Sequence, residues 1–210
     1  SITGLIGPNG AGKTTLFNAI SGLLKPNEGS VRFNNELMTD LSPYRRAKLG
    51  LGRTFQRLEL FPSLSVEENI QVAAEIRGEW SQSSIGTSSV IRSVQQVMKL
   101  TGLDSIASKS VAEIPTGKAR LVELARTIVQ GPSMLLLDEP ASGQNENETE
   151  EFAQILKILN TEGITILLVE HDMSLVMDVC DKVFVLDFGT LIADGTTQEI
   201  QNNPVVIDAY

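Results

Sequence analysis

The sequence predicts an α/β fold with a mostly parallel sheet core and an inserted α-helical subdomain. Three observations predict this fold. A glycine-rich loop lies between an apolar pentapeptide and a helical segment, apolar stretches alternate with helical patterns after residue 132, and the intervening stretch has helical periodicity. Because parallel strands need crossover connections, such alternation is typical of a parallel sheet that helices cover on both faces.

The length of 210 residues predicts one domain, since single hydrophobic cores stop growing near roughly 250 to 300 residues. We expect residues 1–210 to form this domain. Residues 1–64 and 132–210 would make the sheet core, and residues 65–131 would make the helical subdomain.

Composition excludes several classes of protein. Hydrophobic residues make up 41% and charged residues 20%, as in ordinary folded α/β proteins. The net charge of -9 argues against nucleic acid as a partner. The longest apolar stretches, Met134–Leu137 and Ile164–Val169, are far shorter than the roughly 20 residues of a membrane-spanning helix, so any membrane role is expected to be peripheral. A single cysteine, Cys180, favours a reducing, cytosolic location.

The first part of the chain reads as strand, loop and helix. The apolar run Ile2–Ile6 predicts a buried strand, and Lys13–Ser21 predicts a helix that ends at Gly22. Since the chain starts at Ser1 and enters this strand at once, we expect upstream strands to be missing and a sheet edge to be unpaired. Val31–Phe33 predicts a short strand that ends at an Asn34-Asn35 turn, and residues 53–62 read as a loop.

Helical patterns dominate from Ser65 to Gln130, including one apolar face built on Leu121, Leu124, Ala125 and Ile128. Ser81–Ser89 is rich in serine and reads as a surface connection. After Pro132 the apolar runs predict strands at Met134–Leu137, Ile164–Val169, Val183–Leu186 and Leu191–Ala193, with a helix around Phe152–Leu159.

The segment Gly7–Thr14 matches the phosphate-binding pattern G-x-x-x-x-G-K-[ST], and it lies between the predicted strand and helix as that pattern requires. Its backbone N–H groups would wrap phosphates, Lys13 would neutralise their charge, and Thr14 would offer its hydroxyl to Mg²⁺. The alternative is a chance glycine turn, which the strand and helix context makes improbable. The residues expected to bind the nucleotide here are Gly7, Pro8, Asn9, Gly10, Ala11, Gly12, Lys13, Thr14 and Thr15.

Two adjacent carboxylates, Asp138 and Glu139, end the predicted strand Met134–Leu137. The carboxyl ends of strands are where open α/β sheets bind their ligands. Asp138 is suited to the water shell of Mg²⁺, and Glu139 is suited to orient or deprotonate the water that attacks the γ-phosphate. The alternative is a strand that simply ends in exposed acids.

Taken together, five motifs resemble the ABC ATPases, a subfamily of P-loop NTPases. They are Gly7–Thr15, Gln56, the Leu137–Pro140 segment, the Ser142-Gly143 pair and His171. The resemblance runs from Ser1 to Tyr210. It implies ATP and Mg²⁺ as cofactors, ATP hydrolysis as the activity, and a place at the cytoplasmic face of the cell membrane. The partners it implies are a second ATPase subunit, membrane permease subunits and, indirectly, a solute-binding protein.

The resemblance also assigns roles to two residues that mean little alone. Gln56 matches the glutamine that senses Mg²⁺ and the γ-phosphate, and residues 57–62 would meet the membrane subunit. His171 is the only histidine. A lone histidine is more often structural, but this position matches the histidine that contacts the γ-phosphate and the attacking water. The expected catalytic residues are therefore Glu139, His171, Gln56 and Lys13, and the expected metal ligands are Thr14, Gln56 and Asp138.

Two departures affect the surface that would face a second ATPase. The family's Leu-Ser-Gly-Gly-Gln signature, which would contact ATP in the partner's site, is replaced by Ile114 followed by Pro115, Thr116, Gly117 and Lys118, with a helix expected from Ala119 to Gln130. Asn145 stands where the family carries an aspartate. The residues that would bind the chain's own ATP are therefore intact, whereas the residues that would contact ATP in the partner's site are altered. This favours a non-identical partner subunit as a hypothesis, although an identical one stays open.

The segments Gly52–Gln56 and Leu168–Met173 look like the subgroup that serves branched-chain amino acid, urea and amide importers. Import of an amino-acid-like or amide-like solute is the expectation. Two alternatives remain open. One is an ABC-type ATPase that acts on DNA or ribosomes, which the acidic composition disfavours. The other is a regulatory subunit that binds ATP with little hydrolysis, which Pro115 and Asn145 favour and Glu139 and His171 oppose.

Overall fold

The computed structural model describes residues 1–81 and 93–209, and the expected surface connection over Ser81–Ser89 lies, apart from Ser81, outside the described residues. The strands are β1 (Ile2–Ile6), β2 (Arg32–Phe33), β3 (Glu36–Leu37), β4 (Leu51–Arg53), β5 (Met134–Asp138), β6 (Thr165–Val169), β7 (Lys182–Asp187) and β8 (Thr190–Gly195). The α-helices are α1 (Lys13–Ser21), α2 (Pro43–Lys48), α3 (Val66–Ser81), α4 (Val94–Leu100), α5 (Thr116–Val129), α6 (Glu146–Thr161), α7 (Met173–Val179), α8 (Thr197–Gln201) and α9 (Pro204–Ala209). Two short 3₁₀ helices, η1 (Asp104–Ile106) and η2 (Val111–Glu113), lie between α4 and α5.

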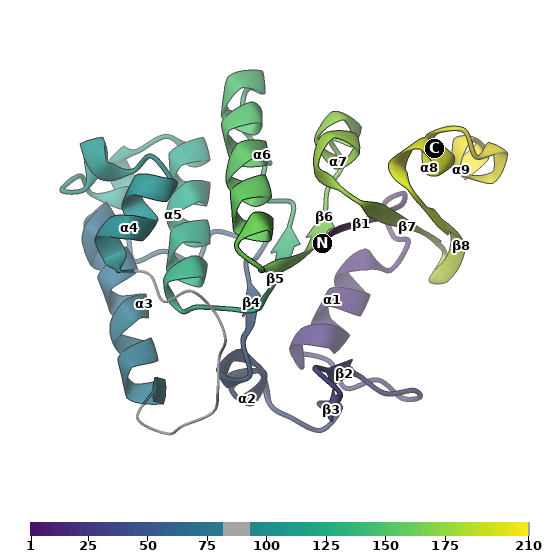
Figure 1. The fold of residues 1–210 in the computed structure, drawn as a ribbon, viewed down its shortest axis with the longest axis horizontal. Helices are drawn as coiled ribbons and strands as arrows, with labels where there is room; N and C mark the ends of the chain where they lie inside the picture. Colours follow the sequence, from purple (N-terminus) through teal and green to yellow (C-terminus); the bar gives the residue numbers. More distant parts are fainter. Residues whose placement is uncertain (82–92, 210) are drawn as a thin grey trace.

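A six-stranded sheet in the order β4-β5-β6-β1-β7-β8 forms the core. The strands from β4 to β7 pair in parallel, and β8 pairs antiparallel with β7 at one edge. In Figure 1, α1 and α2 cover one face of the sheet, α6 and α7 cover the other, and α3, α4 and α5 group beyond β4 and β5. The expected α/β class with a mostly parallel sheet is confirmed.

Side-chain alternation in β5 builds both layers of the core. Leu135 and Leu137 join a cluster that includes Phe152 of α6, whereas Leu136 joins a second cluster that includes Phe17 of α1. Because successive residues of a strand point to opposite faces, one apolar run anchors helices on both sides.

The strand order brings four chain segments to one edge of the sheet. The strands β4, β5, β6 and β1 run in parallel, so their carboxyl ends lie together. In this order the strands lead directly into the segment to Gln56, the acid Glu139, the His171 turn and the Gly7–Gly12 loop. Residues expected from separate motifs thus converge on this edge.

The boundaries of β1 and α1 agree with the expectation, and the Asn34-Asn35 turn joins β2 to β3 with positive φ angles of 49° and 66°. The sequence reading was wrong at β4, where Arg53 is a strand residue rather than the start of a loop. It also missed α2. Both elements are short, and Gly52 interrupts the apolar pattern that would have predicted β4.

Within residues 1–81 and 93–209, no helix combines the length and apolar character that crossing a membrane requires.

Candidate active site

The loop between β1 and α1 is closed around the side chain of Lys13. Its ammonium donates hydrogen bonds to the carbonyl oxygens of Gly7 at 2.7 Å and Pro8 at 3.0 Å. Burial lowers the pKa of Lys13, while the negative charges of Glu139 and Asp138 oppose that shift. The positive charge therefore lies inside the loop and within electrostatic reach of both acids.

Gly7 is required by the close approach of the neighbouring strand. A Cβ atom at this position would lie 2.1 Å from the carbonyl oxygen of Leu186 in β7, far inside van der Waals contact. On the other side of the loop, the Gly189 amide donates to the carbonyl oxygen of Ala11 at 2.9 Å. The loop is thus fixed against the β7–β8 hairpin, and its shape does not depend on side-chain caps.

Helix α1 begins at Lys13, with Gly12 at the N-cap in a left-handed conformation, and Thr14 and Thr15 are exposed in its first turn. The first N–H groups of a helix have no partners within it and carry partial positive charge. The loop and the start of the helix therefore have the backbone geometry and the partial positive charge that suit an anion such as phosphate.

Asp138 at the end of β5 is buried beside an arginine. Its Oδ2 lies 3.4 Å from Nη2 of Arg53, and the side chains of both residues are less than a tenth exposed. Its backbone amide faces the Thr54 hydroxyl at 3.4 Å. Burial raises the pKa of Asp138, the Arg53 guanidinium opposes that rise, and the charge of Glu139 adds to it.

Glu139 adopts a backbone conformation that a non-glycine residue rarely takes, with φ at 49°. Its amide donates to the carbonyl oxygen of Val169 at 2.9 Å, so the residue stays tied to β6 while its side chain leaves the line of β5. Such local strain costs on the order of 1 to 3 kcal/mol and is concentrated at functional sites. The turn directs the carboxylate toward Gln56 and His171.

Gln56, Glu139 and His171 meet through their side chains. The Gln56 Nε2 donates to Oε2 of Glu139 at 2.9 Å, and Nε2 of His171 lies 2.9 Å from Oε1 of Glu139. One carboxylate thus links residues that follow β4, β5 and β6. The Glu139 side chain remains partly exposed and His171 is about half exposed, so the group is accessible to water and ligand.

Glu170 is buried next to this group and holds two loops together. Its Oε1 accepts a hydrogen bond from the Ala141 amide at 2.8 Å, and its Oε2 accepts one from the His171 amide at 3.1 Å. Burial raises the pKa of Glu170, and these backbone donors oppose the rise. The residue fixes where the His171 turn lies relative to the loop after β5. In the sequence it was recognised only as part of a subgroup pattern.

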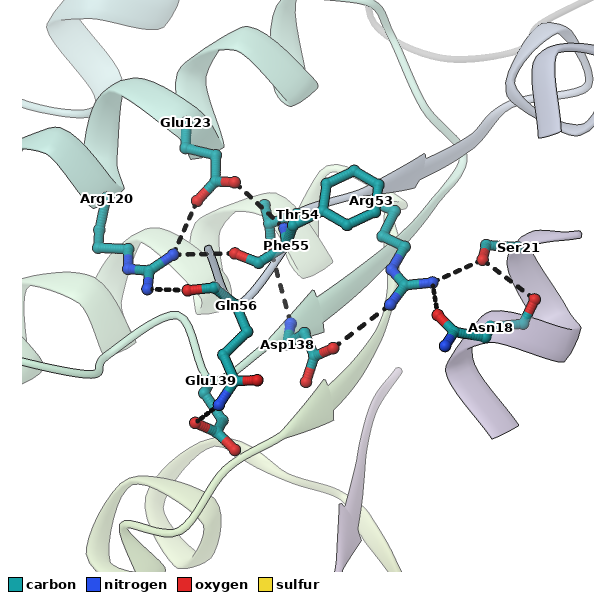
Figure 2. Close-up of polar contacts among 10 residues, drawn as sticks. All are labelled: Asn18, Ser21, Arg53, Thr54, Phe55, Gln56, Arg120, Glu123, Asp138 and Glu139. Carbon is teal, nitrogen blue, oxygen red and sulfur yellow. Dashed lines mark hydrogen bonds and ion pairs between the residues drawn. The ribbon is translucent and has the colours of Figure 1, made fainter. Parts of the chain in front are cut away.

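The segment around Gln56 is clamped to helix α5 by two residues that the sequence reading missed. Arg120 donates to the carbonyl oxygens of Phe55, at 2.9 Å, and Gln56. Glu123 accepts from the Phe55 amide at 3.1 Å and pairs with Arg120 at 3.1 Å (Figure 2). No sequence pattern links these residues to the Gln56 segment, which lies more than 60 positions earlier. The one available signal was the presence of charged residues on a mostly buried helix.

The segment Pro115–Lys118 lies at the N-terminus of α5 and is not joined to the phosphate-binding loop by any hydrogen bond among the described residues. Thr116 lies near Gly143, and a Cβ at Gly117 would come within 2.9 Å of the Glu148 carboxylate. Lys118 pairs with Glu151 at 3.7 Å.

The expected helix start at Ala119 was wrong, because α5 already begins at Thr116. Pro115 occupies the N-cap, where its missing N–H costs no intrahelical bond, and its carbonyl oxygen accepts from the Ala119 amide at 3.0 Å.

Asn145 caps helix α6. Its Oδ1 accepts from the Glu148 amide at 3.0 Å, and the Glu148 carboxylate accepts from the Asn145 amide at 3.0 Å, which forms a reciprocal capping box. Asn145 therefore has a structural role as a helix cap. It also differs in charge from the aspartate that the family carries at this position.

Comparison with known proteins agrees with this arrangement. A family described as ABC transporter matches residues 1–142. The chain belongs to the ABC transporter family. A second family, described as branched-chain amino acid ATP-binding cassette transporter, matches residues 190–210 of this ABC ATPase.

Named relatives of this ABC ATPase span almost its whole length. The high-affinity branched-chain amino acid transport ATP-binding protein LivG of Escherichia coli strain K12 is 38% identical over 219 residues, which covers 100% of this chain and 86% of LivG. The corresponding protein BraF of Pseudomonas aeruginosa is 36% identical with the same coverage. The crystal structure of an ABC transporter's ATP-binding cassette in its ADP conformation superposes with a TM-score of 0.85 at 28% identity, and covers 100% of this chain and 87% of that one.

Proposed function

We propose that this ABC ATPase hydrolyses Mg²⁺-ATP to energise import of branched-chain amino acids through separate membrane subunits. That it is an ATPase subunit of a transporter follows from its family, whereas the solute is inferred from LivG and BraF, whose names specify branched-chain amino acids. The observation that carries the catalytic proposal is the contact of Gln56 and His171 with the two oxygens of Glu139, beside the phosphate-binding loop.

The loop residues Gly7 to Thr15 hold the nucleotide phosphates in this proposal. Backbone N–H groups of the loop and the start of α1 face the phosphate oxygens, and the Lys13 ammonium neutralises them. Lys13 is already placed within the loop by its bonds to Gly7 and Pro8, so it needs only a small movement of its flexible side chain to reach a phosphate.

The residues present fit Mg²⁺. Among the described residues no cluster of three or more acids, histidines or cysteines is arranged to hold a metal by itself. Mg²⁺ is usually bound through one or two carboxylates together with waters and substrate phosphates, so Asp138, the Thr14 hydroxyl and the Gln56 amide oxygen suffice. Bound there, the ion would neutralise charge on the β- and γ-phosphates.

Glu139 is the general base or orienting group for the attacking water. One oxygen is held by Gln56 and the other lies against His171, so its carboxylate has a fixed direction. A carboxylate held this way accepts a proton from water and directs the oxygen lone pair toward the γ-phosphate. In this proposal His171 supports Glu139, whose carboxylate it contacts, and would also contact the transferred phosphoryl group.

We further propose that residues 1–64 and 132–210 act as the nucleotide-binding core and residues 65–131 as a helical subdomain, with residues 57–62 meeting the membrane subunits. The N-terminus of α5, with Pro115 to Lys118, would face ATP bound to a second ATPase subunit. Pro115 has no N–H and no hydroxyl to offer there, which favours a non-identical partner. The complex would lie on the cytoplasmic face of the membrane and would receive its solute from a binding protein.

Reconstitution tests the transport function. The protein would be reconstituted in liposomes together with the membrane subunits encoded beside its gene and their binding protein. ATP would be supplied on the side of the membrane that this subunit faces. ATP-dependent uptake of radiolabelled leucine, absent with Lys13→Ala, is the expected result. Uptake of urea or a short amide instead of leucine would reject branched-chain amino acids as the solute, but it would still support the proposal that the protein energises transport.

The second candidate is a regulatory subunit that binds ATP and hydrolyses it slowly, which the replacement of the signature serine by Pro115 favours. Turnover by this chain alone and beside each candidate partner ATPase separates the two. Tight ATP binding with no turnover in any combination would favour the regulatory role.

A further inference from the structure

Arg53 is a buried guanidinium that connects β4 to both α1 and β5. Its Nη2 lies 3.4 Å from Oδ2 of Asp138, while its Nη1 donates to Oδ1 of Asn18 at 2.9 Å and to Oγ of Ser21 at 2.6 Å (Figure 2). Asn18 and Ser21 belong to α1, the helix that begins at the phosphate-binding loop. One side chain therefore joins the helix behind the loop to the acid at the end of β5.

The guanidinium is held in place independently of Asp138. It lies over the ring of Phe55 at 4.9 Å and over the ring of Phe17 at 5.7 Å. Among the described residues its Nε has no hydrogen-bond partner, so its orientation depends on the Nη contacts and the two rings. Because α1 and the two aromatic rings hold Arg53 in place, Arg53 restrains the Asp138 carboxylate that it contacts.

A second buried arginine shows what a purely structural role looks like in this protein. Arg46 of α2 is 1% exposed, and within residues 1–81 and 93–209 it donates only to backbone carbonyl oxygens, those of Leu41, Ala19, Ile20 and Thr39. Arg53 instead bonds side chains, and one of them is Asp138. The two arginines both pack near the C-terminal half of α1, which makes Arg46 a matched control.

We infer that Arg53 is a positioning residue for nucleotide-dependent Mg²⁺ binding, because it fixes the orientation of Asp138 relative to α1 and the phosphate-binding loop. This inference rests on the proposed role of Asp138 toward Mg²⁺. By holding Oδ2, Arg53 leaves the other oxygen of Asp138 to face the metal's water shell. Partners that orient a metal-binding carboxylate commonly change metal affinity when they are removed.

The test measures nucleotide binding rather than turnover. Binding of a fluorescent ATP analogue would be titrated in EDTA and in Mg²⁺ for the wild type, Arg53→Met, Arg53→Lys and Arg46→Met. In Arg53→Met we expect the gain in affinity on adding Mg²⁺ to shrink about tenfold or more, with binding in EDTA changed less than about twofold. Arg53→Lys keeps the positive charge but makes fewer contacts, so it should retain part of the gain in affinity on adding Mg²⁺.

Arg46→Met should lower the melting temperature and keep the full gain from Mg²⁺. An unchanged gain in Arg53→Met would overturn the inference, as would an equal loss of the gain in Arg46→Met. If the wild type itself shows no gain from Mg²⁺, the proposed role of Asp138 fails and this inference fails with it.

If Arg53→Met does not fold, the double variant Asn18→Ala with Ser21→Ala decides the question, since it removes the anchor on α1 and leaves the Arg53–Asp138 contact. A gain from Mg²⁺ reduced about threefold or more supports the inference, and an unchanged gain overturns it.

Discussion

The carboxylate of Glu139 and the imidazole of His171 lie 2.9 Å apart, between the segments that follow two neighbouring parallel strands, β5 and β6. The contact is set by the backbone on both sides. Glu139 turns out of its strand with a left-handed φ of 49°, and the His171 amide is held by the buried Glu170 carboxylate at 3.1 Å. The pair is therefore arranged by the fold of the chain itself.

Replacing His171 with alanine should lower turnover more than ATP binding. The imidazole supports the Glu139 carboxylate, and groups that assist proton transfer commonly contribute about 10²- to 10⁴-fold. We expect kcat to fall by about 10²-fold or more, while the Kd for ATP changes less than about threefold. Steady-state hydrolysis and equilibrium ATP binding measure the two quantities. A parallel loss of both would assign His171 to binding instead of catalysis.

Removing Arg120 should destabilise the protein strongly. Arg120→Met removes the cation that is hydrogen-bonded to the buried Glu123 carboxylate, and it leaves two carbonyl oxygens, of Phe55 and Gln56, without this donor. Breaking a buried ion pair on one side costs about 3 to 5 kcal/mol. Urea unfolding of Arg120→Met should show this loss. Lys99→Met on α4, an exposed cation, serves as the control and should stay within about 0.5 kcal/mol of the wild type.

Glu123 should contribute a characteristic pH dependence. Burial raises the pKa of this carboxyl, with the Phe55 amide and Arg120 opposing the rise. A carboxyl with a raised pKa in the folded state stabilises the fold at pH values below its unfolded pKa, and that contribution is lost as the pH rises toward the folded pKa. The stability of Glu123→Gln relative to the wild type should therefore increase as the pH rises from about 4.5. A flat difference across this range would contradict the assignment.

The Asn145 cap should be replaceable by aspartate and not by alanine. The Asn145 side chain accepts from the Glu148 amide at the start of α6. Asparagine and aspartate cap about equally well, whereas alanine costs about 1 kcal/mol. Chemical denaturation should place Asn145→Asp close to the wild type and Asn145→Ala below it. Equal loss in both variants would show that a negative charge at this position costs as much stability as the cap contributes, and would contradict this prediction.

The single cysteine should be unreactive while the protein is folded. Burial raises the pKa of the Cys180 thiol to about 12, with the charge of Asp181 adding to the rise. Because the thiolate is the reactive form, alkylation by iodoacetamide at pH 8 should be about a thousandfold slower than in the urea-unfolded chain. The same shift means that stability contributed by the neutral thiol is lost as the pH rises from about 9 toward 12. Rapid labelling of the folded protein would contradict this burial.

Sequence periodicity predicted the elements whose residues are either uniformly buried or regularly amphipathic. The strands β1, β5 and β6 were placed within one residue of their bounds, since their apolar runs are long enough to specify buried strands. The helix α1 was placed correctly because the glycine-rich loop precedes it and Gly22 ends it. The strand β4 has only three residues and contains Gly52, so it lies in the sheet because of its pairing with β5 and not because of its own pattern.

Local motifs identified the residues of the candidate site but not what orients them. Lys13, Asp138 and Glu139 follow from the loop pattern and from paired acids at a strand end. Arg53 contacts Asp138 across 85 positions, and Arg120 reaches the Gln56 segment across 64 positions. Contacts of that range depend on how strands and helices pack, which no short pattern encodes. The structure was therefore needed to identify these long-range contacts.

The measurement that tests the central claim most directly is ATP hydrolysis in the presence of Mg²⁺ by the wild type and by Glu139→Gln, with Glu150→Gln on the exposed surface of α6 as the matched control. We expect Glu139→Gln to bind ATP with an affinity near that of the wild type and to lose about 10²-fold or more in turnover, while Glu150→Gln keeps full turnover. Turnover by Glu139→Gln equal to that of the wild type would contradict the assignment of Glu139 as the residue that activates water.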